Sequence, residues 1–446
     1  MTLLDVFLLP LFIVVILITA FIIRETVYKH HVGRKYILAG LGFKILGALF
    51  FCAIYAFYYG GLGDAFVYHE STVALSEAIE DSPKLGLELW ATEANTYDLR
   101  LSELSDKIPY YSGENTYMVV RIATVLGFLC GNSFWVLNLL FATLSFMGLW
   151  LLYTVFVDVY PKAKDTMAMA VFFVPSVFFW GSGLLKDTVT MGCVGGFTYG
   201  VYHLLIKRDR ILVSIFLIWI CSLLIDAIKG YILWAFFIPT AYWLFFHYRE
   251  VARRQNLKIF FNVCMLSAVA LGVYFLSDRV ADIGYYMLGK FVGMAMDFQS
   301  WHGYLSNEGQ TGYTLGEIEF SIPGILSKFP ASVNVALFRP YLSEVNNPVM
   351  LIAALEGTAF MAVTLYVFFK VGFFRSLKIA FGTPFISFCL LYALFFAFAV
   401  GFATYNFGAL VRYKIPCLPF YIGAVFMVLE QYRIESSSSN TKFTIQ

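Results

Sequence analysis

The chain has 446 residues, of which 60% are hydrophobic, 19% are aromatic and 13% are charged. A globule of this size in water needs far more polar side chains to cover its surface, so the composition excludes a soluble protein and predicts an integral membrane protein. The formal net charge of +2 says little by itself, and no nucleic-acid partner is predicted.

Apolar runs of about 20 residues recur along almost the whole chain. Each run can cross a ~30 Å hydrocarbon layer at ~1.5 Å per residue, and the lack of alternation favours helices over barrel strands. The expected fold class is an all-α polytopic membrane protein. Eleven spans are expected near residues 6–23, 36–59, 134–158, 166–184, 187–206, 211–226, 230–248, 258–277, 347–370, 379–402 and 414–431.

Charge predicts the orientation of these spans. Basic residues cluster in short connections, such as 207–210 and 249–258, which the positive-inside rule places in the cytoplasm. The acidic loop 61–115 and a second long loop, 278–346, are then extracytoplasmic. The expected location is the bacterial cytoplasmic membrane, with the N-terminus outside and the C-terminus inside.

Two segments need separate treatment. Residues 117–129 are apolar, but a span there would place the basic 207–210 connection outside, so the sequence predicts an interfacial or re-entrant helix. Residues 434–446 are polar and rich in serine, which predicts a disordered cytoplasmic tail. Residues 1–433 are expected to form one transmembrane domain.

The stretch WGSGLLKDT, residues 180–188, interrupts apolar sequence with Lys186 and Asp187. The predicted topology puts both residues in a tight turn between two helices at the outer face, where they need not be buried in lipid. They are candidates for substrate binding. The alternative is a local ion pair in which Asp187 caps the following helix.

Further polar residues are expected at the same face. Asp64 follows the second span in GLGDAFVYHE and is the candidate catalytic base, or one more solvated acid of the loop. Asp226 and Lys229, three residues apart, are candidates for substrate binding or for a local pair. The other candidate binding residues of this face are Trp301, His302, Arg339, Glu344, Arg412 and Tyr413.

Some of these residues also have explanations that involve no substrate or catalytic role. Arg412 and Lys414 are also typical of cations that snorkel at a membrane interface, and Trp301 is also typical of an aromatic belt. His69 and His302 lack the spacing of a metal site.

An outer face with a carboxylate and several cations over apolar walls suits one kind of reaction. Arginine can bind two phosphate oxygens at once, so Arg339, Arg412 and Lys186 could stabilise a departing phosphate of a lipid-linked donor. A carboxylate near the acceptor hydroxyl could take its proton.

Three strings carry a resemblance: VPSVFFWGSGLLKD (174–187), ALFRPYLSEVNN (336–347) and NFGALVRYKIPCLP (406–419). They resemble those of a group of polytopic bacterial proteins associated with surface-polysaccharide synthesis. The overall plan also resembles the GT-C superfamily of polyprenyl-phosphate-sugar-dependent glycosyltransferases and is similar to O-antigen and exopolysaccharide polymerases.

The resemblance implies a polyprenyl-linked saccharide donor and a glycan or lipid-linked acceptor, with surrounding membrane lipids. It puts Asp64 in the place of the first-loop catalytic carboxylate. The paired Asp-x-Asp or Glu-x-Asp of GT-C enzymes is absent, so no cofactor is assigned, and a role for Mg²⁺ or Mn²⁺ stays open.

The expected function is a membrane glycosyltransferase or polysaccharide polymerase acting at the extracytoplasmic face. A transporter or flippase of lipid-linked oligosaccharide is the alternative, because Lys44 and Glu356 lie within predicted spans. A non-catalytic scaffold of an envelope complex is a third reading.

Overall fold

A computed structural model describes residues 3–254, 293, 296, 300, 312–319 and 321–443. Helices dominate this part of the chain, and no β-strand forms among the described residues. One isolated antiparallel bridge joins Gly312 and Asn406. The expectation of an all-α protein is confirmed for these residues.

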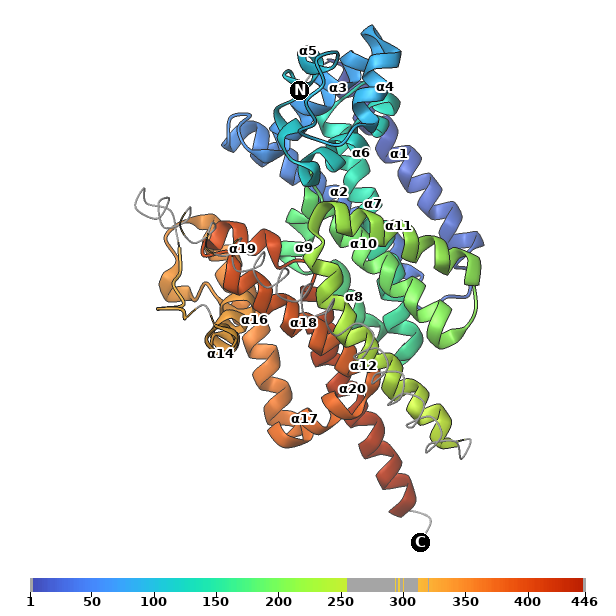
Figure 1. The fold of residues 1–446 in the computed structure, drawn as a ribbon. Coiled ribbons are helices and arrows are strands. Elements are labelled where there is room, and N and C mark those ends of the chain that lie inside the picture. The colour runs from blue at the N-terminus through green and yellow to red at the C-terminus, as the bar shows by residue number, and fades with distance from the viewer. Residues whose placement is uncertain are drawn as a thin grey trace. The chain divides into compact units, whose positions relative to one another are not determined.

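The chain divides into two compact units, residues 1–234 and 235–446. In Figure 1 the first unit runs from blue to green and the second from yellow-green to red. The helices of the first unit are α1 (Leu3–Thr26), α2 (Lys35–Ala53, continued by a π-helical turn, Ile54–Tyr58), α3 (Asp64–Asp81), α4 (Pro83–Ala91), α5 (Ser102–Ser105), α6 (Glu114–Cys130), α7 (Phe134–Val159), α8 (Lys164–Phe172), α9 (Pro175–Trp180), α10 (Lys186–Val201, continued by a π-helical turn, Tyr202–Lys207) and α11 (Ile211–Lys229).

Helix α12 (Tyr231–Arg254) begins in the first unit and continues into the second. The other helices of the second unit are α14 (Ile322–Ser327), α15 (Phe329–Phe338), α16 (Pro348–Val371), α17 (Phe373–Gly382), α18 (Pro384–Ala403), α19 (Phe407–Tyr413) and α20 (Leu418–Phe443).

Seven helices of the described part are long and apolar enough to cross a membrane, or eight if the bent pair α19 and α20 counts as one span. The seven are Leu4–Thr26, Lys35–Tyr58, Phe134–Val159, Lys186–Lys207, Ile211–Lys229, Met350–Val371 and Pro384–Ala403. They support a polytopic membrane protein, and each coincides with a predicted span.

The predicted span 414–431 corresponds to the bent pair, and three other predicted spans do not appear among these helices. Residues 258–277 lie outside the described residues, and residues 230–248 form α12, which does not meet the same limits of length and composition. Residues 166–184 form two short helices, α8 and α9. Pro175 explains the break, because it lacks a backbone N–H and favours an extended Val174, whose φ and ψ are −73° and 123°.

Helix α7 packs against both α2 and α10 in the first unit. Glycines bring α7 and α10 close together: a Cβ atom added to Gly148 would lie 1.9 Å from the carbonyl oxygen of Gly192, and one added to Gly195 would lie 2.0 Å from that of Gly148. Small residues of this kind allow close approach of membrane helices.

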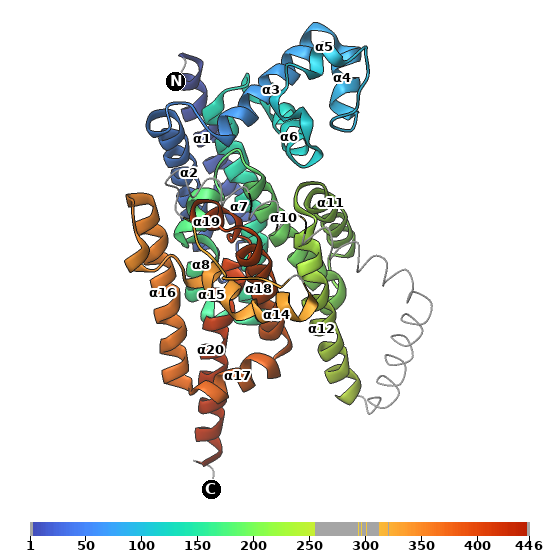
Figure 2. The same cartoon turned by 60° about the vertical axis from the view of Figure 1, so that its left-hand side comes forward.

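The region 61–115, predicted as an acidic loop, folds into helices. Helices α3, α4 and α5 form there, and α6 packs against α3. Both views show α3 to α6 gathered together (Figures 1 and 2). Helix α6, which contains residues 117–129, is not among the helices that meet the limits for a span.

In the second unit, α18 packs against α15 and α20. Gly401 of α18 lets the backbone of α15 approach, since an added Cβ atom would lie 2.1 Å from the carbonyl oxygen of Ser332. A Cβ atom added to Gly357 of α16 would likewise lie 2.6 Å from the carbonyl oxygen of Phe338. These contacts hold the end of α15, and therefore Arg339, against α16.

Residues 434–443 of the predicted tail continue helix α20, which ends at Phe443, and residues 444–446 lie outside the described residues. Ion pairs explain part of the extension. Arg433 pairs with Glu430 one turn earlier at 3.3 Å, and Glu435 lies 3.5 Å from Arg375 of α17. Local charge pairs of this kind favour a helix over a disordered chain.

Candidate functional site

The stretch WGSGLLKDT links α9 to α10 inside the first unit. It was predicted as a turn at the membrane face, but the structure buries most of it. Ser182, Leu184 and Asp187 are fully buried, and the backbone N–H of Leu184 donates to Oδ1 of Asn138 at 2.7 Å. Backbone that leaves a helix inside a protein needs such partners, and Asn138 supplies one from α7.

Lys44, near the middle of α2, holds the same stretch. Its ammonium group donates to the carbonyl oxygens of Gly181 and Val177, at 2.6 and 3.0 Å, and lies 3.4 Å from Oγ of Ser145. The carbonyl oxygens at the C-terminal end of α9 carry the partial negative charge of the helix dipole. Lys44 therefore has a structural role that the sequence did not predict.

Lys44→Met is expected to lower the free energy of unfolding by about 2–4 kcal/mol, because it leaves two buried carbonyl groups without their donor. Thermal unfolding of the purified protein in detergent measures the change. Lys35→Met, an exposed lysine at the start of the same helix, is the control and should unfold like the wild type. Equal stability of the two variants would contradict the role given to Lys44.

Asp187 and Lys229 form a buried ion pair across 42 residues of sequence. Their side chains are 0% and 9% exposed. Two predicted alternatives are wrong: Asp187 does not cap α10, whose N-cap is Leu185, and Lys229 pairs with Asp187 and not with Asp226. Asp226 is exposed and Lys186 is partly exposed.

Asp64 is the first residue of α3. Gly63, with φ of 105°, lets the chain turn into the helix, a conformation that favours glycine. The hydroxyl of Tyr110 donates to Oδ1 of Asp64 at 3.4 Å, and the carboxylate is only partly buried. A partly exposed carboxylate held at a helix start is able to accept a proton from a bound hydroxyl.

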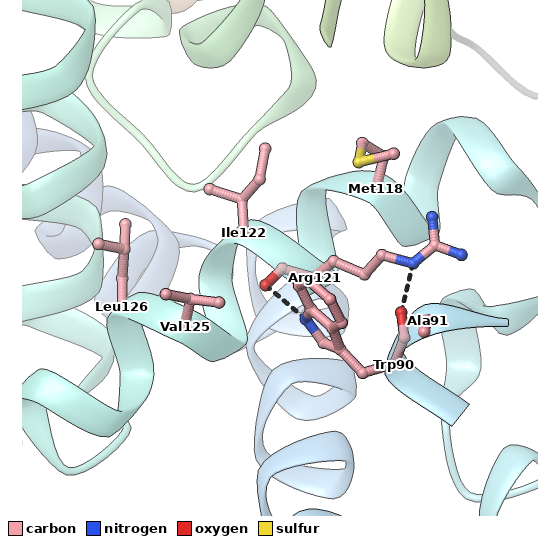
Figure 3. A pocket seen from close by; sticks show the side chains of 7 residues that line it. All are labelled: Trp90, Ala91, Met118, Arg121, Ile122, Val125 and Leu126. Atoms are coloured by element: carbon pink, nitrogen blue, oxygen red, sulfur yellow. Dashed lines mark hydrogen bonds between the residues drawn. The ribbon is translucent and has the colours of Figure 1, made fainter. Parts of the chain in front are cut away.

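An open hollow of about 480 Å³ lies between α4 and α6 (Figure 3). Arg121 crosses it: Nε donates to the carbonyl oxygen of Trp90 at 2.8 Å, Nη2 donates to that of Thr92 at 2.5 Å, and the guanidinium pairs with Glu114. This arginine joins α4 to α6 and has its charge compensated.

In the second unit, Arg339 and Glu344 form an ion pair with a fixed geometry. Nε of Arg339 donates to both carboxylate oxygens of Glu344, at 3.1 and 3.0 Å, and Nη2 makes a shorter contact. The backbone N–H of Tyr341 donates to the same carboxylate at 2.8 Å. The hydrogen bonds from Arg339 lower the pKa of Glu344, and those to Glu344 raise the pKa of Arg339.

Three aromatic rings surround Arg339. The centres of the Phe407, Tyr341 and Tyr313 rings lie 5.3, 5.8 and 5.9 Å from its Cζ atom. Tyr313 is fixed in turn by its N–H, which donates to the carbonyl oxygen of Tyr405 at 3.1 Å. Within the described part of the chain, Nη1 of Arg339 makes no hydrogen bond, so two donors stay available beside the rings.

Two further cations, Arg412 and Lys414, lie at the bend of 66° between α19 and α20. Arg412 lies 5.8 Å from the ring of its neighbour Tyr413. Lys414 is fully buried, and its ammonium group has no hydrogen-bond partner among the described residues. Glu356 of α16 is also buried and attracts Lys414 electrostatically. Lys414 therefore does not snorkel to an exposed interface in this structure.

Four of the predicted site residues form two ion pairs in the structure. It pairs Asp187 with Lys229 and Arg339 with Glu344. Trp301 and His302 lie outside the described residues. Sequence reasoning missed Asn138 and Tyr313, and it treated Lys44 only as a sign of transport. A polar residue inside an apolar run was the available signal for Lys44 and Asn138.

No group of three or more His, Cys, Asp or Glu side chains that could hold a metal ion occurs in the described ranges. No family model, curated protein or solved structure matches this chain. The resemblance to GT-C enzymes and polysaccharide polymerases therefore stays a prediction, and the functional proposal rests on the two sets of residues described above.

Proposed function

We propose that the protein is a membrane glycosyltransferase or polysaccharide polymerase. It transfers a sugar or oligosaccharide from a polyprenyl-phosphate or polyprenyl-diphosphate donor to a glycan or lipid-linked acceptor. The observation that carries the proposal is Arg339, a guanidinium that is paired with Glu344 and lies among three aromatic rings. Arginine suits a phosphate, and aromatic faces suit the apolar faces of a sugar ring.

The proposed reaction is a direct displacement with inversion at the anomeric carbon. The acceptor oxygen attacks the anomeric carbon, its proton passes to Asp64, and the bond between that carbon and the donor phosphate oxygen breaks. The phosphate leaves with the bonding electrons, and a cation stabilises its charge. Lys186 is proposed to help hold the donor phosphate, and the exposed Asp226 is proposed to orient sugar hydroxyls or a cation. The buried pair of Asp187 with Lys229 is proposed to support this region from inside the protein.

The proposal includes the predicted topology: eleven spans in the bacterial cytoplasmic membrane, with the N-terminus and residues 61–115 outside and the C-terminus inside. The distribution of basic residues in short connections supports this orientation.

Arg339→Ala is expected to raise KM for the donor and to lower kcat/KM by about 10- to 100-fold, since hydrogen bonds to charged groups contribute about 1.5–3 kcal/mol. Arg339→Lys should be intermediate, because it keeps the charge but loses the planar fork. Initial rates with a polyprenyl-linked saccharide measure both. Arg100→Ala, which removes an exposed arginine paired with Glu88 and Asp98, is the matched control.

Wild-type rates for both Arg339 variants would argue against a donor contact at this residue. Equal losses for Ala and Lys, with KM unchanged, would instead limit Arg339 to a structural pair with Glu344.

A flippase of lipid-linked oligosaccharide is the second candidate, and a specific observation favours it. Both units contain an interrupted helix, α8–α9 in the first and α19–α20 in the second. Charged residues are buried near each break, Lys44 in the first unit and Lys414 in the second. Interrupted helices with buried polar groups are typical of transporter sites.

A further inference from the structure

Helix α6 has one apolar face that is buried and a second apolar stripe that is partly exposed. The face with Tyr117, Val120 and Thr124 is buried, and α6 packs against α3. A second stripe, spaced by three and four residues, contains Met118, Ile122, Val125, Leu126 and Leu129. Val125 is 53% exposed and Leu129 is 67% exposed. Exposed apolar side chains of this kind are unfavourable on a helix that faces water.

The hollow between α4 and α6 lies along this stripe. Six of its seven lining residues are apolar in body, as Figure 3 shows, and the seventh is Arg121. The guanidinium of Arg121 is 4.6 Å from the ring centre of Tyr117 and is paired with Glu114. The hollow therefore offers hydrocarbon contacts with a compensated charge, which suits an apolar chain better than a phosphate or a sugar.

The contacts of α6 with candidate spans indicate how deeply the helix lies relative to the membrane. The turn that ends α6 touches the start of α1: Ser133 donates to Asp5 at 2.6 Å, and a Cβ atom added to Gly131 would lie 3.2 Å from the Leu4 side chain. The span α7 begins directly afterwards, at Phe134. Helix α6 also packs against α11, another candidate span. The exposed stripe thus begins at the level where two spans enter the membrane.

We infer that the hollow between α4 and α6 binds the hydrocarbon chain of a bilayer phospholipid and so fixes the helices α3 to α6 on the membrane surface. Residues 118–129 would lie in the interface with their apolar stripe against the acyl chains. This inference is independent of the proposed reaction, because it involves neither Asp64 nor Arg339.

The test uses the full-length protein in vesicles of phosphatidylcholine and phosphatidylglycerol that contain a small fraction of a phospholipid with a photoreactive group on its acyl chain. After illumination, peptide mapping locates the covalent adducts. The expected result is adducts on residues 118–129 as well as on the spans. Val125→Asp should reduce the adducts on 118–129 by about tenfold, since a carboxylate is costly against hydrocarbon.

Leu99→Asp is the matched control, because Leu99 is an apolar residue of the same region that is 76% exposed and does not line the hollow. It should leave the adducts on 118–129 unchanged. Val125 is half exposed, so its replacement is compatible with folding, and the wild-type map tests the inference without any variant. Adducts confined to the spans would overturn the inference. So would labelling of 118–129 by a photoreactive polyprenyl phosphate alone, which would assign the hollow to the donor lipid.

Discussion

Lys229→Met is expected to lower the free energy of unfolding by about 3–5 kcal/mol. The pair with Asp187 is buried, so removal of the lysine takes a paired cation away from a carboxylate inside the protein. The same replacement at a solvated pair has little effect, because water compensates the remaining charge. Thermal or denaturant unfolding in detergent measures the loss, and proteolysis of the connection between α9 and α10 shows whether the loss is local.

The double variant Asp187→Asn/Lys229→Met is the decisive control. It removes both charges, so it should recover most of the stability that Lys229→Met loses. Additive destabilisation in the double variant would contradict a direct interaction between the two charges. A wild-type stability of Lys229→Met itself would show that the pair is solvated.

Asp64→Asn is expected to lower the rate of transfer by about 10²–10⁴-fold, the usual contribution of a positioned general base. Asparagine has nearly the same shape as aspartate but cannot accept the proton. The change removes one acidic group from the first turn of α3, which costs only about 0.3–1 kcal/mol, so the protein should stay folded. The measurement is the initial rate at saturating donor, with unfolding temperature as the check on the fold.

Glu70→Gln is the matched control for Asp64→Asn, because Glu70 is an exposed acid on the same helix. It should have the wild-type rate. Full activity of the Asn variant would remove Asp64 as the base, and an equal loss in both variants would point to the general acidity of the region.

Seven of the predicted spans coincide with long apolar helices, because hydrophobic length is the main signal for such a helix. The predicted range 134–158 is nearly the observed Phe134–Val159, and 211–226 lies within Ile211–Lys229. The break at Pro175 was not predicted, although proline was the signal. Helices α3 and α4 were missed because their many charges hide a modest apolar face, and solvated acids are equally typical of a loop.

The contacts between the candidate residues could not be predicted from the sequence. Asp187 and Lys229 were both chosen from sequence, yet each was given a nearby partner, because spacing along one chain says nothing about which helix packs beside which. The same limit applies to Lys44, whose partners are carbonyl groups of α9 that carry no sequence signal. Arg339 and Glu344 lie five residues apart and were both chosen, but the rings around Arg339 come from Tyr313 and Phe407 as well as from its neighbour Tyr341.

Glycosyl transfer from a lipid-linked donor can be measured with the wild-type protein in vesicles and a fluorescent polyprenyl-diphosphate saccharide. Mass spectrometry detects a new glycosidic bond, and a membrane-impermeant quencher detects movement of the saccharide between leaflets. The expected product is longer by the transferred unit, is formed by the wild type and is lost in Asp64→Asn. Movement between leaflets with no new glycosidic bond would contradict glycosyl transfer and identify the protein as a flippase.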